Sequence, residues 1–198
     1  MPMKILVQDN LSAYPAEALE RDLQLLPPWR RKQAMEYKFT EGKRNCTLAY
    51  LLLCRALREE YGITGSPSFI IGEHGKPALA EYPDIHFNLS HCRTAIICAV
   101  SDHPVGVDIE SITRKVSDTL INYSMNEEEQ KQIASSQKQD FFRLWTMKEA
   151  LVKLRGTGLQ GSIPELLLPE NTRDITFTTE EHPDRGYVFS IAQYSKRR

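Results

Sequence analysis

The hydrophobic and polar positions in the first third of the chain follow a helical pattern. Apolar residues recur three and four positions apart over residues 17–25 and 40–61, which places them on one face of a helix. A further short helix is expected after Pro28, because proline is tolerated in the first helical turn. Gly62 directly follows the long segment and indicates where that helix ends.

Strand-like segments occupy the start, the middle and the end of the chain. They are rich in β-branched and apolar residues and are separated by turn-forming residues. They span residues 3–7, 68–71, 86–90, 94–101, 105–110, 175–178 and 187–192. Two more helices are expected over residues 126–134 and 140–154. Because helices and strands are mixed without a regular βαβ alternation, the predicted fold class is α+β.

The charge balance argues against a general attraction for polyanions. The 198 residues include 25 Lys and Arg against 26 Asp and Glu, a net charge of −1. Such a chain is not drawn as a whole to nucleic acid or an anionic membrane, so any basic site must be local. The cluster Arg30-Arg31-Lys32 is explained equally well by a solvated helix or by a phosphate pocket. The length is sufficient to bury a real core in one large domain or two small ones.

The apolar runs and the cysteines indicate a cytoplasmic protein. The longest runs, Leu48–Cys54 and Ala95–Val100, are far too short to span a bilayer. Asp9 interrupts any signal-peptide core. The four cysteines form no CxxC pair and are expected to be free thiols in a reducing compartment. They are Cys46, Cys54, Cys92 and Cys98.

Two carboxylates two positions apart form the sharpest candidate site. Asp108 and Glu110 lie in the strand-like segment Gly106–Glu110, where residues two apart point to the same face. Two like charges this close require a cation between them, or one carboxyl group must take up a proton. Hard oxygen ligands suit Mg²⁺. The alternative is a solvated strand edge that runs into a loop.

A second candidate lies on the predicted helix over residues 140–154. Trp145, Glu149 and Lys153 are four positions apart and therefore share one stripe of that helix. Apolar residues flank the stripe, so Glu149 is expected to be half-buried beside an indole. Glu149 would then be a third metal carboxylate, with Lys153 one turn away to meet a phosphate. The alternative is a simple helical ion pair worth about 0.3–0.5 kcal/mol.

Polar residues also end the strand-like segment Phe87–His91. His91 and Cys92 cannot readily form a Cys/His nucleophile pair, because adjacent residues of a strand point to opposite faces. We therefore favour a hydrogen-bonding or phosphate-contacting role for His91. Lys76 lies on a turn within Gly75-Lys76-Pro77, where most lysines are simply solvated.

Taken in this order, four segments resemble the 4′-phosphopantetheinyl transferases of the Sfp type. They are GKP at 75–77, FNLSH at 87–91, GVDIE at 106–110 and WTMKEALVKLRGTGL at 145–159. The resemblance implies two similar α+β halves related by a pseudo-twofold axis, with the active site between them. We place these halves at residues 1–105 and 106–198.

The resemblance also implies a reaction. Members of this family use coenzyme A and Mg²⁺, move the 4′-phosphopantetheine arm onto a serine of an acyl or peptidyl carrier protein, and release 3′,5′-ADP. Carried over by motif, Asp108, Glu110 and Glu149 would hold the metal. Glu149 would take the proton of the carrier serine, directly or through a metal-bound water, and Lys153 would assist the departing phosphate oxygen.

The same resemblance implies a set of coenzyme A contacts. They are Arg31, Lys32, Thr47, Lys76, Ser90, His91, Lys148 and Lys153. Arg31 is the best match to the basic residues that hold the 3′-phosphate in the family, whereas Ala34 stands where a further basic residue is expected. An apo carrier protein is the expected partner. Neither nucleic acid nor a membrane is expected as a partner, and the chain could act as a monomer.

Two other classes of function are compatible with these residues. One is a different Mg²⁺-dependent phosphoryl enzyme, such as a nucleotide hydrolase, although the chain has no GxxxxGK[ST] loop. The other is a module that binds coenzyme A or a carrier without catalysis. The three carboxylates and Lys153 argue against the second alternative.

Overall fold

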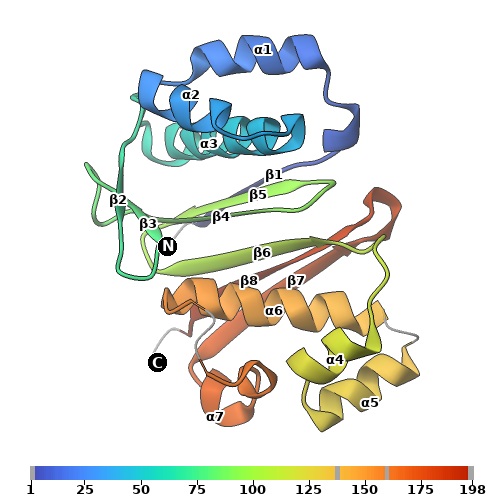
Figure 1. Cartoon of the computed structure of the whole chain (residues 1–198). Helices are drawn as coiled ribbons and strands as arrows, with labels where there is room; N and C mark the ends of the chain where they lie inside the picture. The colour runs from blue at the N-terminus through green and yellow to red at the C-terminus, as the bar shows by residue number, and fades with distance from the viewer. Residues whose placement is uncertain (1–2, 137–138, 159–160, 196–198) are drawn as a thin grey trace.

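Two antiparallel three-stranded sheets pack against each other, and a long helix covers the outer face of each (Figure 1). The computed structural model describes residues 3–136, 139–158 and 161–195. The first sheet has the order β1 (Met3–Gln8), β5 (Ile96–Ser101), β4 (His86–His91), and α3 (Thr40–Tyr61) covers it. The second has the order β6 (Val105–Ser111), β8 (Tyr187–Tyr194), β7 (Ile175–His182), and α6 (Gln139–Arg155) covers it.

The two halves share one topology. Each begins with an edge strand, continues through two shorter helices to the long helix, and ends with two strands, of which the last lies at the centre of the sheet. This repetition is what the predicted pair of similar halves requires. The division at residue 105/106 stays a prediction, and β6 begins at Val105.

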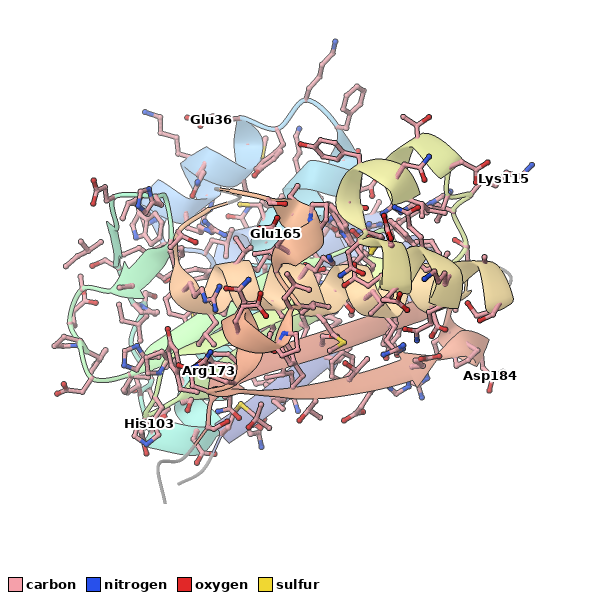
Figure 2. The ribbon with its side chains drawn as sticks, turned by 90° about the horizontal axis from the view of Figure 1, so that it is seen from below. Glu36, His103, Lys115, Glu165, Arg173 and Asp184 are labelled. Carbon is pink, nitrogen blue, oxygen red and sulfur yellow. The ribbon has the colours of Figure 1, made fainter. Side chains whose placement is uncertain are left out.

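Shorter elements fill the connections between these layers. They are η1 (Leu11–Ala13), α1 (Ala16–Leu25), α2 (Pro28–Met35), β2 (Phe69–Ile71), β3 (Pro77–Leu79), α4 (Asp118–Ser124), α5 (Glu127–Ser135), η2 (Ile163–Glu165), α7 (Pro169–Thr172) and η3 (Pro183–Arg185). Figure 2 shows the molecule from below, with α6 crossing the view. Lys115, which precedes α4, and Arg173, which follows α7, lie toward opposite ends of α6. None of the helices in the described part of the chain has the length and hydropathy needed to cross a bilayer.

Alternation along β5 explains why that strand is an unbroken apolar run. Ile96, Cys98 and Val100 pack toward α3, whereas Ile97 and Ala99 pack against the second sheet. A strand buried on both faces needs apolar side chains at every position. The chain meets this requirement throughout Ala95–Val100.

The side chains of β6 alternate in the same way, but only one face of this strand is entirely apolar. Val105, Val107 and Ile109 join the core between the sheets. Since neighbouring residues of a strand point to opposite faces, Asp108 and Glu110 are directed to the α6 side. The outer edge of β6 is tied to the first sheet, because the Val107 amide donates a hydrogen bond of 2.7 Å to Asn88 Oδ1.

Gly106 allows α6 to lie directly on β6. A Cβ atom at this position would lie 2.0 Å from the Ala150 carbonyl oxygen and 2.3 Å from the Leu154 amide nitrogen. Both are helix backbone atoms, which cannot move aside independently. The absence of a side chain at Gly106 therefore sets the distance between the strand that carries Asp108 and the helix that carries Lys153.

Most of the predicted elements are present, with shifted ends. The long helix has the predicted limits, Thr40–Tyr61, and Gly62 ends it with a φ of 68°. Strand β7 extends to His182, beyond the predicted residues 175–178. Exposed polar residues alternate with half-buried ones along most of this strand, so its second half is not an apolar run. Helix α4, whose first turn is capped by the Ser117 side chain, and the short β3 were not predicted. Leu159, the last residue of the fourth motif, lies outside the described residues.

The close approach at Gly106 can be tested by adding a methyl group. Gly106→Ala is expected to destabilise the protein by about 1–3 kcal/mol, since the new atom overpacks the contact between β6 and α6. Gly65→Ala is the matched control, because nothing lies within 4 Å of a Cβ there and its backbone has no positive φ. Urea unfolding of both variants checks the prediction, and equal midpoints would contradict it.

Candidate active site

A pocket of about 330 Å³ opens where β4, β6 and α6 meet. Its walls combine three of the four sequence motifs. The lining residues are Leu89, Ser90 and His91 of β4, Asp108 and Glu110 of β6, and Trp145, Glu149 and Lys153 of α6. The helical stripe predicted for Trp145, Glu149 and Lys153 is therefore the face of α6 that borders the pocket.

One ion pair joins the three elements at the base of this pocket. Lys153 Nζ donates to Asp108 Oδ1 at 2.7 Å and to Ser90 Oγ at 2.8 Å. Ser90 Oγ in turn donates to the same Asp108 oxygen at 2.8 Å. Ser90 belongs to the first half of the chain, and Asp108 and Lys153 belong to the second. The site is thus assembled across the junction between the halves.

The second oxygen of Asp108 lacks a partner. Asp108 is 5% exposed, and its buried Oδ2 accepts no hydrogen bond from any described residue. Leaving a buried carboxylate oxygen unpaired is costly. A cation bound beside Oδ2 would remove this cost, and an all-oxygen donor set is the kind that Mg²⁺ prefers.

The two glutamates of the pocket share this excess of negative charge. Burial raises the pKa of both Glu110 and Glu149, and the Asp108 carboxylate raises each of them further. The positive charge of Lys153 acts in the opposite direction on both. For Glu110, Arg114 at 3.7 Å and a hydrogen bond from Trp145 also lower the pKa. Additional positive charge in the pocket would favour the ionised form of both groups.

The side chains as placed do not form a coordination sphere. Over residues 3–136, 139–158 and 161–195, no group of three or more His, Cys, Asp or Glu residues is arranged to hold a metal ion. Lys153 satisfies one oxygen of Asp108 instead. The metal-binding roles of Asp108, Glu110 and Glu149 therefore stay predictions, which the unpaired oxygen and the raised pKa values support.

His91 lies at the rim of the pocket and contacts α3. Its Nδ1 lies 3.5 Å from Asn45 Nδ2, whose amide hydrogen it can accept when neutral. Partial desolvation, followed by the charge of Lys153, lowers the pKa of His91. Cys92 Sγ pairs with Thr94 Oγ1, which agrees with the expectation that His91 and Cys92 do not form a nucleophile pair.

Lys148 does not line the pocket. It is 1% exposed, and its ammonium pairs with Glu129 Oε2 at 2.8 Å. It also donates to the carbonyl oxygens of Ile163 and Pro164. The structure therefore does not place Lys148 where a coenzyme A contact was expected, since its ammonium is enclosed by protein and holds α5 and η2 against α6.

Lys76 is also occupied by protein atoms. Its ammonium donates to the backbone carbonyl oxygens of Val105, Lys153 and Leu154. Its half-buried side chain lies beside Gly156, and Lys76, Lys153 and Gly156 all line a neighbouring pocket. The predicted contact of Lys76 with coenzyme A is not tested by this geometry.

The three nucleotide contacts predicted in the first half, Arg31, Lys32 and Thr47, lie in different environments. Arg31 donates to the carbonyl oxygens of the α1 C-terminus, at Leu23, Gln24 and Leu26. Thr47 is fully buried and donates to the Lys43 carbonyl one turn earlier. Lys32 is exposed. Neither Arg31 nor Thr47 lines the acidic pocket.

Arg30, which the sequence reading did not select, does line a pocket. This second cavity, of about 510 Å³, lies between α2, the β2–β3 hairpin and β4, and Leu89 borders it as well as the acidic pocket. The Arg30 guanidinium lies 5.5 Å from the Tyr50 ring centroid, and its buried Nε has no partner among the described residues. Arg30 directly precedes Arg31, and neighbouring residues of a helix point about 100° apart. The sequence therefore pointed to the basic cluster, and the structure shows which of its side chains faces the cavity.

Comparison with known proteins agrees with this geometry. Residues 104–193 match the family model of the 4′-phosphopantetheinyl transferase superfamily. The chain is 30% identical over 148 residues to 4′-phosphopantetheinyl transferase Sfp of Bacillus subtilis (strain 168), covering 72% of this chain and 66% of that protein. It is 30% identical over 159 residues to another Bacillus subtilis 4′-phosphopantetheinyl transferase, covering 78% and 70%. A third relative, psf-1 of Bacillus pumilus, is 33% identical over 134 residues, covering 66% and 58%.

The chain belongs to the 4′-phosphopantetheinyl transferase superfamily. The matched regions span between 58% and 70% of these three relatives' own lengths. The family predicted from the four motifs is thereby confirmed, together with a mixed α+β fold.

The raised pKa of Glu149 gives a pH-dependent stability prediction. Glu149→Gln is expected to raise the melting temperature at neutral pH in chelator-treated protein, because the variant has no buried negative charge to maintain. The gain should disappear as the pH falls below the ordinary pKa of a glutamate, where the wild-type side chain is neutral in both states. It should grow as the pH rises from the ordinary glutamate pKa toward the raised folded-state pKa, and level off above it.

Thermal unfolding across this pH range checks the prediction. Glu128→Gln is the control, since the Glu128 side chain is 82% exposed. An equal or lower melting temperature for Glu149→Gln at neutral pH would show that the carboxylate is not destabilised in the pocket.

Proposed function

We propose that this chain transfers the 4′-phosphopantetheine arm of coenzyme A to a serine of an acyl or peptidyl carrier protein and releases 3′,5′-ADP. The observation that carries the proposal is the cluster of Lys153, Asp108 and Ser90, which brings three separate family motifs into one pocket. Membership of the superfamily supports the same reaction.

In this reaction the serine oxygen attacks the phosphorus that carries the pantetheine arm. A new P–O bond forms to serine, and the bond to the bridging oxygen of the diphosphate breaks. Glu149 accepts the serine proton, a role suited to a carboxyl group whose pKa is raised above its ordinary value. Lys153 donates a hydrogen bond to the departing oxygen of 3′,5′-ADP, where negative charge develops.

We further propose that Asp108, Glu110 and Glu149 hold Mg²⁺. The unpaired Asp108 Oδ2 and the raised pKa values of the two glutamates support this assignment. When bound, the ion would neutralise the charge of the coenzyme A diphosphate and so assist the displacement. Without a cation, three carboxylates would repel a substrate that is itself an anion.

The contacts proposed for coenzyme A fall into two groups. Ser90, His91 and Lys153 line the acidic pocket and are available to the diphosphate. In the second cavity we propose Arg30, with exposed Lys32 nearby in sequence, as the cation that meets the 3′-phosphate. Leu89 borders both cavities, so one extended molecule can occupy them together.

The setting proposed for the enzyme is the reducing cytoplasm, where it acts as a monomer on apo carrier proteins. The four free cysteines support this compartment. A single chain contributes both sides of the pocket, because Ser90 and Lys153 come from different halves. The net charge of −1 supports neither nucleic acid nor a membrane as a partner.

The reaction and the role of Glu149 are tested by incubating an apo carrier protein with coenzyme A and Mg²⁺ and measuring its mass. We expect one phosphopantetheine per acceptor. Glu149→Gln should lower the rate by about 100-fold or more, since general base catalysis contributes at least that factor. Cys92→Ala should retain the wild-type rate.

Two outcomes of this assay would contradict the proposal. Full activity of Glu149→Gln would remove Glu149 from the mechanism. Cleavage of coenzyme A without any acceptor would identify a hydrolase instead of a transferase.

The position of Arg30 gives a second test of substrate binding. Arg30→Gln is expected to raise the KM for coenzyme A about tenfold, in line with the loss of one charged hydrogen bond, and to have less effect with dephospho-coenzyme A. Arg31→Gln should lower the melting temperature and leave the preference between these substrates unchanged, since Arg31 is bonded to α1. The reverse pattern would restore the assignment of the 3′-phosphate to Arg31.

A further inference from the structure

Lys76 has the hydrogen bonds of a structural cation, although it lies in a motif that the resemblance assigns to coenzyme A. Its Nζ is 2.5 Å from the Lys153 carbonyl oxygen, 3.2 Å from that of Leu154 and 3.3 Å from that of Val105. A lysine ammonium has three hydrogens and no acceptor. Three backbone oxygens therefore satisfy it completely.

These three oxygens have a physical reason to accept a cation. Lys153 and Leu154 lie in the last turn of α6, where carbonyl groups have no partner within the helix. The helix dipole also places partial negative charge at this end. Gly156 ends the helix with a φ of 68°, and a Cβ there would lie 3.3 Å from Lys76 Cδ. The helix end is thus shaped to admit the lysine stem.

The third oxygen belongs to the strand that carries the acidic residues. Val105 is the first residue of β6, three positions before Asp108. The neighbouring main-chain group, the Val107 amide, is bonded to Asn88 Oδ1 of β4. Two side chains from the first half of the chain therefore bind the outer edge of β6, and one of them, Lys76, also binds the end of α6.

We propose that Lys76 is a positioning residue, which fixes the backbone of Lys153 relative to β6 so that the Lys153 ammonium meets Asp108 and Ser90. This inference rests on the proposed transferase function of the same pocket. The alternative role, a direct contact with a coenzyme A phosphate, requires Lys76 to give up at least one of its three backbone partners. Partial burial lowers the pKa of Lys76, whose side chain is half-buried.

Steady-state kinetics separate positioning from phosphate binding. Lys76→Met keeps most of the aliphatic stem and removes the three hydrogen bonds. We expect kcat to fall by about 10- to 100-fold, the usual cost of losing a residue that orients a catalytic group. The dissociation constant of coenzyme A, measured by calorimetry without carrier, should change by less than about threefold.

Lys131→Met is the matched control, because the Lys131 side chain is 69% exposed and pairs only with Glu128 among the described residues. It should retain wild-type kinetics. A rise in the coenzyme A dissociation constant of about tenfold or more for Lys76→Met with kcat preserved, or no change in either constant, would overturn the proposal.

A second measurement uses the wild-type protein and does not depend on the folding of a variant. Lysines are methylated with formaldehyde and a borohydride reductant, with and without coenzyme A, and mapped by peptide mass spectrometry. We expect Lys76 to react slowly in both samples, whereas exposed Lys32 and Lys131 are modified in the sample without coenzyme A. Rapid modification of Lys76 that coenzyme A suppresses would identify a ligand contact and overturn the proposal.

The two experiments also separate this inference from the proposed function. If wild-type protein transfers nothing to any carrier, the transferase function fails, whereas the methylation pattern still reports whether Lys76 is held by backbone. If transfer occurs and Lys76 reacts freely, the function stands and the positioning role fails.

Discussion

The Lys153 ammonium and the Asp108 carboxylate meet at 2.7 Å between α6 and β6, and only one oxygen of that carboxylate is satisfied. The geometry of the pocket depends on this half-neutralised pair. Breaking a buried pair leaves a charge without compensation, so the strand and the helix are constrained to remain together. The remaining oxygen still has the capacity to bind a cation. The same contact therefore contributes to the fold and leaves one carboxylate oxygen of Asp108 without a hydrogen-bond partner among the described residues.

The chemistry of β6 follows from a division between its two faces. One face supplies Val105, Val107 and Ile109 to the core between the sheets. This burial fixes the register of the strand, because a shift by one residue would turn the carboxylates into the apolar core between the sheets and the valines toward α6. Asp108 and Glu110 are consequently held on the side of α6. The raised pKa of Glu110 results from a buried position that hydrophobic packing imposes.

Much of this site could be predicted from periodicity, whereas several contacts could not. The two-residue period of a strand placed Asp108 beside Glu110, and the helical period placed Trp145, Glu149 and Lys153 on one stripe, which the pocket confirms. The protein partners of Lys148 and Arg31 could not be predicted in this way, because each lies one position along a helix from a residue that lines a cavity. Periodicity locates a face only when the buried side of the helix is known. Lys148 is bonded to residues 15 to 19 positions away in the sequence. Arg31 is bonded to residues 5 to 8 positions away. No local sequence pattern indicates such partners.

The bond between Asn88 and the Val107 amide has a mechanical consequence. It links a side chain of one sheet to the main chain of the other at a buried position. Sliding the sheets along the strand direction would break this bond. The buried Val107 amide would then be left without a hydrogen-bond partner in an apolar interface, at a free-energy cost of about 1–3 kcal/mol. Shear between the two sheets is therefore resisted beside the pocket where β4, β6 and α6 meet.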